Sequence, residues 1–235
     1  MITINNAAQH TLDWYRCRLG MITGSNVGII MKSGKGKPFS DTAESYLYQL
    51  VSERTMNPKV ICNDELFELY LRQTNVTTKA MQWGNEQEEN ARSLYSVKTG
   101  LRMVEVGSCK HDTIEKFASS PDGFYYNENT GEKICLEIKC LSQKEYMKYL
   151  DSVTDGESLL KVNSQYFYQC HAHMMVTGAS ATDFVVYNPF QNIPIYIVRI
   201  ERDDKIASEI AERVNLANDF IKEKIERQKN IKVAC

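Results

Sequence analysis

Apolar and polar positions follow two different periods along this chain, and these divide it into helical and extended segments. A spacing of three to four residues is typical of one buried helix face, whereas strict alternation is typical of a half-buried strand. The clearest helical spacing follows Ser40 and Asp41, which are expected to cap a helix that continues to about Glu53. Similar patterns predict helices on both sides of a turn at 20–25 within residues 8–31, and at 85–99, 142–151, 163–177 and 203–229.

Extended segments are expected between these helices, at 101–107, 116–119, 123–126, 134–140, 182–187 and 195–200. Residues 55–80 are polar and predict irregular structure apart from 65–71. Since helices and strands are interspersed, the sequence predicts one α/β domain over residues 1–235, with helices on the faces of a mixed central sheet. A length of 235 residues is enough for one sizeable core.

The expected strand at 134–140 carries an informative pair of polar residues. Side chains alternate between the two sides of a strand, so Glu137 and Lys139 project from one face while Leu136, Ile138 and Cys140 project from the other. The apolar face can pack into a core, which leaves a carboxylate and an ammonium side by side on an open face. The simplest interpretation is a solvated ion pair, worth at most about 1 kcal/mol.

Asp122 is expected to lie close to this pair. Residues 127–131, Asn-Glu-Asn-Thr-Gly, are typical of a hairpin turn that would fold the segment after Asp122 back along the strand carrying Glu137. Two carboxylates that approach closely repel each other unless a cation lies between them, and an all-oxygen site suits Mg²⁺ or Mn²⁺. Asp122, Glu137 and Lys139 therefore predict the centre of a metal-dependent phosphodiesterase.

Five sequence blocks surround these residues in a fixed order: 13–25, 83–92 with 99–100, 119–123, 136–140, and 166–169 with 174–178. Together they resemble the lambda-exonuclease-like, YqaJ-type viral recombinase family of the PD-(D/E)xK nuclease superfamily, over about residues 10–200. The resemblance implies a restriction-endonuclease-like core within a single nuclease domain. Each block alone is modest, but five in the same order are specific.

The resemblance also implies roles at the metal centre. The expected ligands of one or two Mg²⁺ or Mn²⁺ ions are Asp122, Glu137, the main-chain carbonyl of Ile138, and Glu88. Lys139 is expected beside the scissile phosphate, where an ammonium can orient the attacking water and offset developing charge. Gln169 is expected at the same centre, where its amide can donate to the water or the phosphate.

Glu88 also fits a structural role. Asn85 could be a helix N-cap with Glu88 at the third helical position, and Glu88 could pair with Arg92 four residues later. Glu86 and Glu89 lie so close to Glu88 in the sequence that either could be the residue that matches the family glutamate.

Arg18 and Ser25 match the family residues that receive the 5′-terminal phosphate of DNA. A guanidinium can bind phosphate through two hydrogen bonds, and a serine hydroxyl can donate beside it. Arg16 is the alternative if the register slips, and Ser25 could instead be a helix N-cap. Trp14 fits a core position better than a base-stacking wedge. His171 and His173 are expected to pack or face solvent, since no third histidine completes a zinc site.

Composition narrows the class of protein further. The 43% hydrophobic and 25% charged residues are those of an ordinary globular protein, and no apolar run approaches membrane-spanning length. Seven scattered cysteines indicate reduced thiols rather than disulfides or an iron–sulfur cluster. With no signal peptide visible at the N-terminus, a cytoplasmic location is expected.

A formal net charge of −2 at pH 7 gives no basic surface over the whole molecule. Local basic groups remain, because Lys32, Lys35 and Lys37 share a Gly-rich loop, and Lys144 and Lys148 follow the acidic strand. Either group could line a channel for the DNA backbone, although a charged loop is more often only solvated.

The resemblance implies a Mg²⁺-dependent exonuclease that digests linear double-stranded DNA from its 5′ ends and leaves 3′ single strands for phage-type recombination. It further implies a ring-shaped homotrimer, a phage or prophage origin, and a single-strand annealing protein as partner. Residues 55–80 look longer than the matching family segment, and this difference weakens the prediction that digestion proceeds from the 5′ end. Two alternative functions stay open. The protein could be an endonuclease of the same superfamily, or a catalytically idle DNA-binding module, although the intact Asp122, Glu137 and Lys139 argue against the second.

Overall fold

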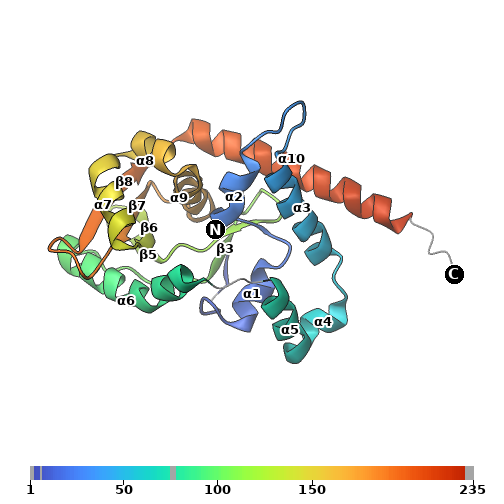
Figure 1. Ribbon diagram of the computed structural model, residues 1–235, viewed down its shortest axis with the longest axis horizontal. Helices are drawn as coiled ribbons and strands as arrows, with labels where there is room; N and C mark the ends of the chain where they lie inside the picture. Colours follow the sequence, from blue (N-terminus) through green and yellow to red (C-terminus); the bar gives the residue numbers. More distant parts are fainter. Residues whose placement is uncertain (1–2, 6, 75–77, 231–235) are drawn as a thin grey trace.

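The computed structural model describes residues 3–5, 7–74 and 78–230, which form helices and short strands (Figure 1). The helices are α1 (Leu12–Arg18), α2 (Gly24–Ile30), α3 (Asp41–Arg54), α4 (Pro58–Cys62), α5 (Asp64–Thr74), α6 (Lys79–Thr99), α7 (Gln143–Ser152), α8 (Gly156–Val162), α9 (Ser164–Thr177) and α10 (Asp204–Lys229). The strands are β1 (Thr3–Asn5), β2 (Ile22–Thr23), β3 (Ser108–Lys110), β4 (Phe117–Ser119), β5 (Gly123–Tyr126), β6 (Lys133–Cys140), β7 (Ala181–Tyr187) and β8 (Ile195–Glu201). Within these ranges, no helix combines the length and the apolar character needed to cross a membrane.

The strands pair into two mixed sheets. One has the order β1-β3-β4-β2, in which β4 and β2 run parallel, and the other has the order β5-β6-β7-β8, in which β6 and β7 run parallel. The α/β class with mixed strands flanked by helices is confirmed, but the strands divide into two sheets instead of one.

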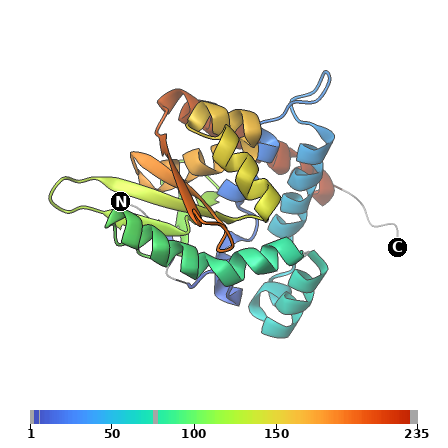
Figure 2. The same cartoon turned by 60° about the vertical axis from the view of Figure 1, so that its left-hand side comes forward.

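Helices cover both faces of the β5–β8 sheet (Figures 1 and 2). On one face, Ala91 and Tyr95 of α6 pack against Leu136 and other apolar residues of β6 and β7. On the other face, α7, α8 and α9 pack against Cys135 and Phe184. A separate cluster of buried side chains joins α2, α3, α9 and α10 to the smaller sheet. Strand β6 therefore has its apolar side against α6 and its Glu137 side under α9.

Several helix ends form where capping residues predict them. The Ser40 hydroxyl accepts a hydrogen bond from the amide of Ala43 at the start of α3, and Gly178 ends α9 in a left-handed conformation. The helices expected at 142–151, 163–177 and 203–229 and the strands expected at 123–126, 134–140, 182–187 and 195–200 agree with the structure to within about a residue.

The region 55–80 is more helical than predicted, because α4 forms where irregular structure is expected and α5 extends beyond the exception at 65–71 at both ends. It contains α4, which begins after the N-cap Asn57, and α5, where the Asn63 side chain accepts the amide of Leu66. Phe67 is buried against the rest of the molecule, so a single apolar residue anchors α5. Residues 75–77 lie outside the described ranges.

Helix α6 begins earlier than predicted. Its N-cap is Thr78, whose hydroxyl accepts a hydrogen bond from Met81, so Asn85 and Glu88 lie inside the helix and form no capping box. Helix α8 was not predicted, although Asp155 and Ser158 form a capping box at its start.

The strand expected at 101–107 is also wrong. Only an isolated bridge between Val104 and Phe124 forms there, and the strand lies at Ser108–Lys110 between β1 and β4. Strand β1 was not predicted. Three-residue strands depend on distant partners, which local alternation does not reveal.

Candidate active site

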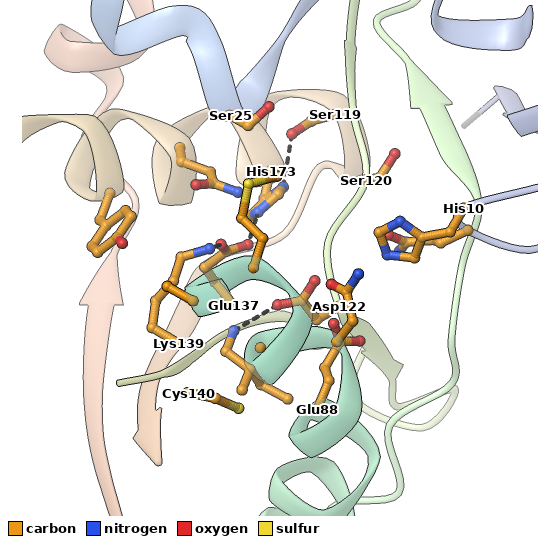
Figure 3. Close-up of a pocket in the computed structure, with 18 of the residues that line it drawn as sticks. His10, Ser25, Glu88, Ser119, Ser120, Asp122, Glu137, Lys139, Cys140 and His173 are labelled. Carbon is orange, nitrogen blue, oxygen red and sulfur yellow. Dashed lines mark hydrogen bonds and ion pairs between the residues drawn. The ribbon is translucent and has the colours of Figure 1, made fainter. Parts of the chain in front are cut away.

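A cavity of about 450 Å³ lies where β4, β6, α1, α2, α6 and α9 meet. All eight residues predicted for the site line it: Arg18, Ser25, Glu88, Asp122, Glu137, Ile138, Lys139 and Gln169. Figure 3 shows several of these side chains pointing into one space from different elements. Residues far apart in the sequence are therefore brought together as the sequence blocks predict.

The hairpin of β5 and β6 positions Asp122. The turn at 127–131 forms with Gly131 in a left-handed conformation, and the amide of Gly131 donates to the carbonyl of Asn127 over 2.8 Å. The amide of Asp122 donates to the carbonyl of Leu136 over 2.9 Å, and its carboxylate oxygen Oδ2 accepts from the amide of Ile138 over 2.7 Å. Backbone hydrogen bonds at both ends of the residue thus fix Asp122 beside β6.

Glu137 lies on a covered face rather than the open face predicted. Helix α9 packs over it, and its side chain is 1% exposed. The Lys139 ammonium forms an ion pair with Oε1, and His173 Nε2 lies 2.6 Å from Oε2. Burial raises the pKa of Glu137, but the charge of Lys139 and the hydrogen bond from His173 outweigh it, so the pKa lies below its ordinary value.

The other two carboxylates are held less favourably as anions. Burial, followed by the nearby charges of Glu137 and Glu88, raises the pKa of Asp122 well above its ordinary value. Burial also raises the pKa of Glu88, although its ion pair with Arg92 opposes the shift. The pairing of Glu88 with Arg92 agrees with the sequence. The pocket therefore concentrates negative charge that its own cations offset incompletely.

This charge and the available oxygen atoms fit a hard divalent cation. Glu137 Oε1 is buried and, apart from its ion pair with Lys139, has no partner among the described residues. Asp122, Glu88 and the Ile138 carbonyl add oxygen donors of the kind that Mg²⁺ and Mn²⁺ prefer. Within residues 3–5, 7–74 and 78–230, no three His, Cys, Asp or Glu side chains are already arranged as a metal cluster. Glu137 and Glu88 are instead turned to Lys139, His173 and Arg92.

Lys139 and Gln169 complete the polar lining above β6. The Lys139 ammonium lies 5.0 Å from the centre of the Tyr166 ring, and Gln169 on α9 is 8% exposed. Burial lowers the pKa of Lys139, but the charges of Glu137 and Asp122 outweigh it and raise the pKa, so the side chain is a fixed cation.

Arg18 occupies the other end of the pocket. Its guanidinium stacks on Trp14 at 4.2 Å and donates through Nη1 to the Ser120 hydroxyl over 2.8 Å. Burial lowers the pKa of Arg18 to about 10, so it remains charged at neutral pH. Trp14 is 7% exposed, in agreement with a core position. Ser25 lies in the first turn of α2, where Thr23 rather than Ser25 is the N-cap.

Arg16 has a different environment. Its guanidinium pairs with Asp13 and Asp64 and donates to the carbonyl of Ile61, on the side of α1 that faces α5. The structure therefore places Arg18, and not Arg16, in the pocket.

Sequence reasoning missed several polar residues of the pocket, among them Gln9, His10, Ser119, Ser120 and His173. Ser120 lies only two residues before Asp122, and this closeness in sequence is a signal that could have identified it. His173 is four residues after Gln169, so it shares a helix face with a residue already assigned to the pocket. His171, by contrast, packs against Phe167 with ring centroids 4.6 Å apart.

Two other predictions concern groups outside the pocket. The six cysteines in the described part of the chain are free thiols, as predicted. In the Gly-rich loop, Lys37 pairs with Asp41 and Glu44, whereas Lys32 and Lys35 are exposed.

Comparison with known proteins gives one family. Residues 13–180 match the YqaJ-like viral recombinase domain. No curated protein sequence matches the chain.

Solved structures of two exonucleases share the fold over most of the chain. An alkaline exonuclease from Laribacter hongkongensis, LHK-Exo, superimposes with a TM-score of 0.74 at 28% identity, covering 93% of this chain and 96% of that one. The same enzyme in complex with dAMP superimposes equally well. A phage-related exonuclease from Haemophilus somnus 129PT has a TM-score of 0.63 at 19% identity, covering 88% of this chain and 96% of that one.

Proposed function

The chain belongs to the YqaJ-like viral recombinase family, and we propose that it is a metal-dependent exonuclease that hydrolyses linear double-stranded DNA from its 5′ ends. The observation that carries this proposal is one pocket that joins a carboxylate cluster with Lys139 at one end to Arg18 and Ser120 at the other. The likeness to LHK-Exo supports exonuclease activity, and the complex of that enzyme with dAMP supports a nucleotide product.

The carboxylate end would hold the cation and the scissile phosphate. Asp122, Glu137, Glu88 and the Ile138 carbonyl would bind one or two Mg²⁺ or Mn²⁺ ions. When bound, such an ion supplies a Lewis acid that polarises the scissile phosphate. Lys139 contributes a fixed positive charge beside the phosphate, which stabilises the charge that develops on its oxygens. Gln169 would donate its amide to the phosphate or the attacking water. The oxygen of that water forms a new P–O bond as the bond to the leaving oxygen breaks; the attacking water gives up a proton to solvent, and the leaving oxygen takes one up.

The Arg18 end would receive the 5′-phosphate. A guanidinium is a planar double donor that suits a terminal phosphate, and the stack on Trp14 holds it in one orientation. Ser120 and Ser25 add hydroxyl donors at the same end. Anchoring the terminal phosphate at one end of the pocket would place an internal phosphodiester at the other, which supports cleavage from the 5′ end.

Assembly and cellular role follow from the family resemblance. A homotrimer would surround the DNA, and the 3′ single strands it leaves would be passed to a single-strand annealing protein of phage-type recombination in the bacterial cytoplasm. Native mass spectrometry with and without duplex DNA tests the trimer, which requires a mass three times that of the 27.0 kDa chain.

A time course on linear duplex DNA tests the activity. The substrates carry a 5′-phosphate or a 5′-hydroxyl, with Mg²⁺ or EDTA, and a covalently closed plasmid is included. We expect Mg²⁺-dependent loss of the 5′-phosphorylated strand, slower loss of the 5′-hydroxyl strand, and an intact plasmid. Plasmid cleavage would assign an endonuclease that uses the same centre, and no cleavage with any divalent metal would favour the DNA-binding module.

Matched variants separate the two ends of the pocket. Arg18→Ala should reduce the preference for a 5′-phosphate about 10- to 100-fold through loss of a charged hydrogen bond, whereas Arg16→Ala should keep it. Lys139→Ala should lower the single-turnover rate about 10²- to 10³-fold, with Lys133→Ala on the same strand as its control. A wild-type rate for Lys139→Ala would contradict the role of the ammonium.

A further inference from the structure

A buried histidine connects the carboxylate cluster to the smaller sheet. His173 lies on α9, is fully buried, and has hydrogen-bond partners at both ring nitrogens (Figure 3). Nε2 lies 2.6 Å from Glu137 Oε2, and Nδ1 lies 2.8 Å from the Ser119 hydroxyl at the end of β4. The family role proposed above uses neither His173 nor Ser119.

The directions of these hydrogen bonds follow from the chemistry of the groups. An ionised carboxylate can only accept, so Nε2 donates to Glu137 Oε2. In the neutral ring, Nδ1 is then the acceptor and the Ser119 hydroxyl donates to it. One oxygen of Glu137 is thereby held by His173, and the other, Oε1, faces the pocket in its ion pair with the Lys139 ammonium.

We propose that His173 is a positioning residue, which fixes the Glu137 carboxylate so that Oε1 is the oxygen presented to the cation. This inference rests on the proposed function, because it assigns Glu137 as a metal ligand. Residues behind a ligating group commonly set its orientation, and their loss typically lowers metal affinity about 10- to 100-fold.

The surroundings of His173 are rigid, as a positioning role requires. A methyl group placed on Gly24 of α2 would lie only 1.9 Å from the Ser119 hydroxyl oxygen, so α2 and β4 enclose that hydroxyl tightly. Thr177 donates from its own hydroxyl to the His173 carbonyl over 2.7 Å. Ser119 can therefore hold the ring, and the ring can hold Glu137, with little freedom at any step.

His171 shows what a packing histidine looks like on the same helix. It is 2% exposed, close to the burial of His173, yet its ring packs against Phe167. The two residues are matched in type, burial and helix, and differ in whether the ring meets Glu137. That difference makes His171 the control for His173.

Two substitutions of His173 isolate the contact with Glu137. A glutamine amide reaches about as far as Nε2 and can still donate to the carboxylate, whereas an asparagine amide reaches only the position of Nδ1. The full-length variants His173→Gln, His173→Asn and His171→Asn are first compared with wild type by thermal unfolding in EDTA. Mn²⁺ is then titrated into each metal-free protein, and the free ion is counted by electron paramagnetic resonance.

We expect His173→Asn to weaken Mn²⁺ binding about 10- to 100-fold, while His173→Gln and His171→Asn remain within a few-fold of wild type. Equal effects of Gln and Asn at position 173, or wild-type affinity for His173→Asn, would overturn the inference while leaving the nuclease assignment in place. If His173→Asn does not fold, Ser119→Ala removes the support of the ring and should weaken Mn²⁺ binding in the same direction. A wild-type protein that neither binds Mn²⁺ nor cleaves DNA would instead reject the proposed function itself.

Discussion

At the scale of single residues, the pocket is defined by how its charges are offset. Glu88 has Arg92, and Glu137 has Lys139 and His173. Asp122 accepts a backbone hydrogen bond from Ile138 and, among the described residues, forms no ion pair with a basic side chain. The raised pKa of Asp122 has the same origin, since burial and two neighbouring carboxylates act on it together. A bound divalent cation would therefore stabilise the ionised form of Asp122 more than that of Glu88 or Glu137.

His171 gives a pH-dependent prediction that is separate from the metal. Burial lowers its pKa from the ordinary 6.5 to about 4, against a raising effect of Asp203 and a further lowering by Arg202. Between about pH 6.5 and 4 the unfolded state therefore binds a proton that the folded state does not. The contribution of His171 to stability is complete above pH 6.5 and is lost as the pH falls towards 4, by up to about 3 kcal/mol.

Urea unfolding of wild type and His171→Leu at pH 7.5, 6, 5 and 4 measures this contribution. The substitution can change stability at every pH through packing, so the informative quantity is the slope with pH. We expect the wild type to lose more stability than His171→Leu across this range. Parallel curves would show that His171 binds protons equally in both states.

The residues of the site differ in how far sequence can identify them. Asp122, Glu137 and Lys139 belong to one hairpin, whose turn and alternation are local, so their proximity could be predicted. Ser119 and His173 meet only because α9 packs over β6 and β4, and no local period states which helix covers which strand. The prediction that Glu137 lies on an open face was wrong for the same reason, because α9 buries the Glu137 side chain.

At the scale of elements, α2 and α9 pack closely through glycine. A methyl group on Gly28 would lie 2.8 Å from the Cα atom of Gln165, which is backbone and cannot turn aside. Gly28→Ala should therefore destabilise the fold by about 1–3 kcal/mol through overpacking. Urea unfolding measures the change in the free energy of unfolding.

Gly84 on α6 provides the matched control. A methyl group there meets no atom within 4 Å, and alanine favours a helix over glycine by about 1 kcal/mol. Gly84→Ala should therefore leave stability unchanged or raise it. If Gly28→Ala were as well tolerated as Gly84→Ala, the close approach of α2 and α9 would be wrong.

Elements with strong local signals could be predicted, and those with distant determinants could not. Helices α3, α7, α9 and α10 combine caps with apolar spacing, and their predicted bounds agree closely with the structure. Helix α5 was anticipated only over 65–71, because its polar composition hides much of an amphipathic pattern in which only Phe67 is buried. Strands β1 and β3 pair across more than 100 residues of sequence, beyond the reach of any local pattern.

At the scale of the whole molecule, a net charge of −2 means that overall charge does not attract DNA. We propose that binding comes from local cations, which would include Arg18 and the exposed Lys32 and Lys35. Each phosphate that a cation neutralises contributes about −0.9 to the slope of log affinity against log salt concentration on duplex DNA. Lys37 should contribute less, because Asp41 and Glu44 already pair with it.

Fluorescence anisotropy of a labelled duplex in EDTA, over a series of KCl concentrations, tests this distribution. If the Gly-rich loop contacts the backbone, Lys32→Ala with Lys35→Ala should make the slope shallower by about 1.8, since two phosphate contacts are lost. Lys222→Ala with Lys229→Ala is the control of equal charge, because both lysines pair with glutamates on or beside α10. Equal changes in the two double variants would mean that only net charge matters, and an unchanged slope in the first would remove the loop from the DNA path. A steep slope that depends on Lys32 and Lys35 would instead extend the DNA path from the pocket to the loop between α2 and α3, which joins the site to a larger binding surface despite the acidic total charge.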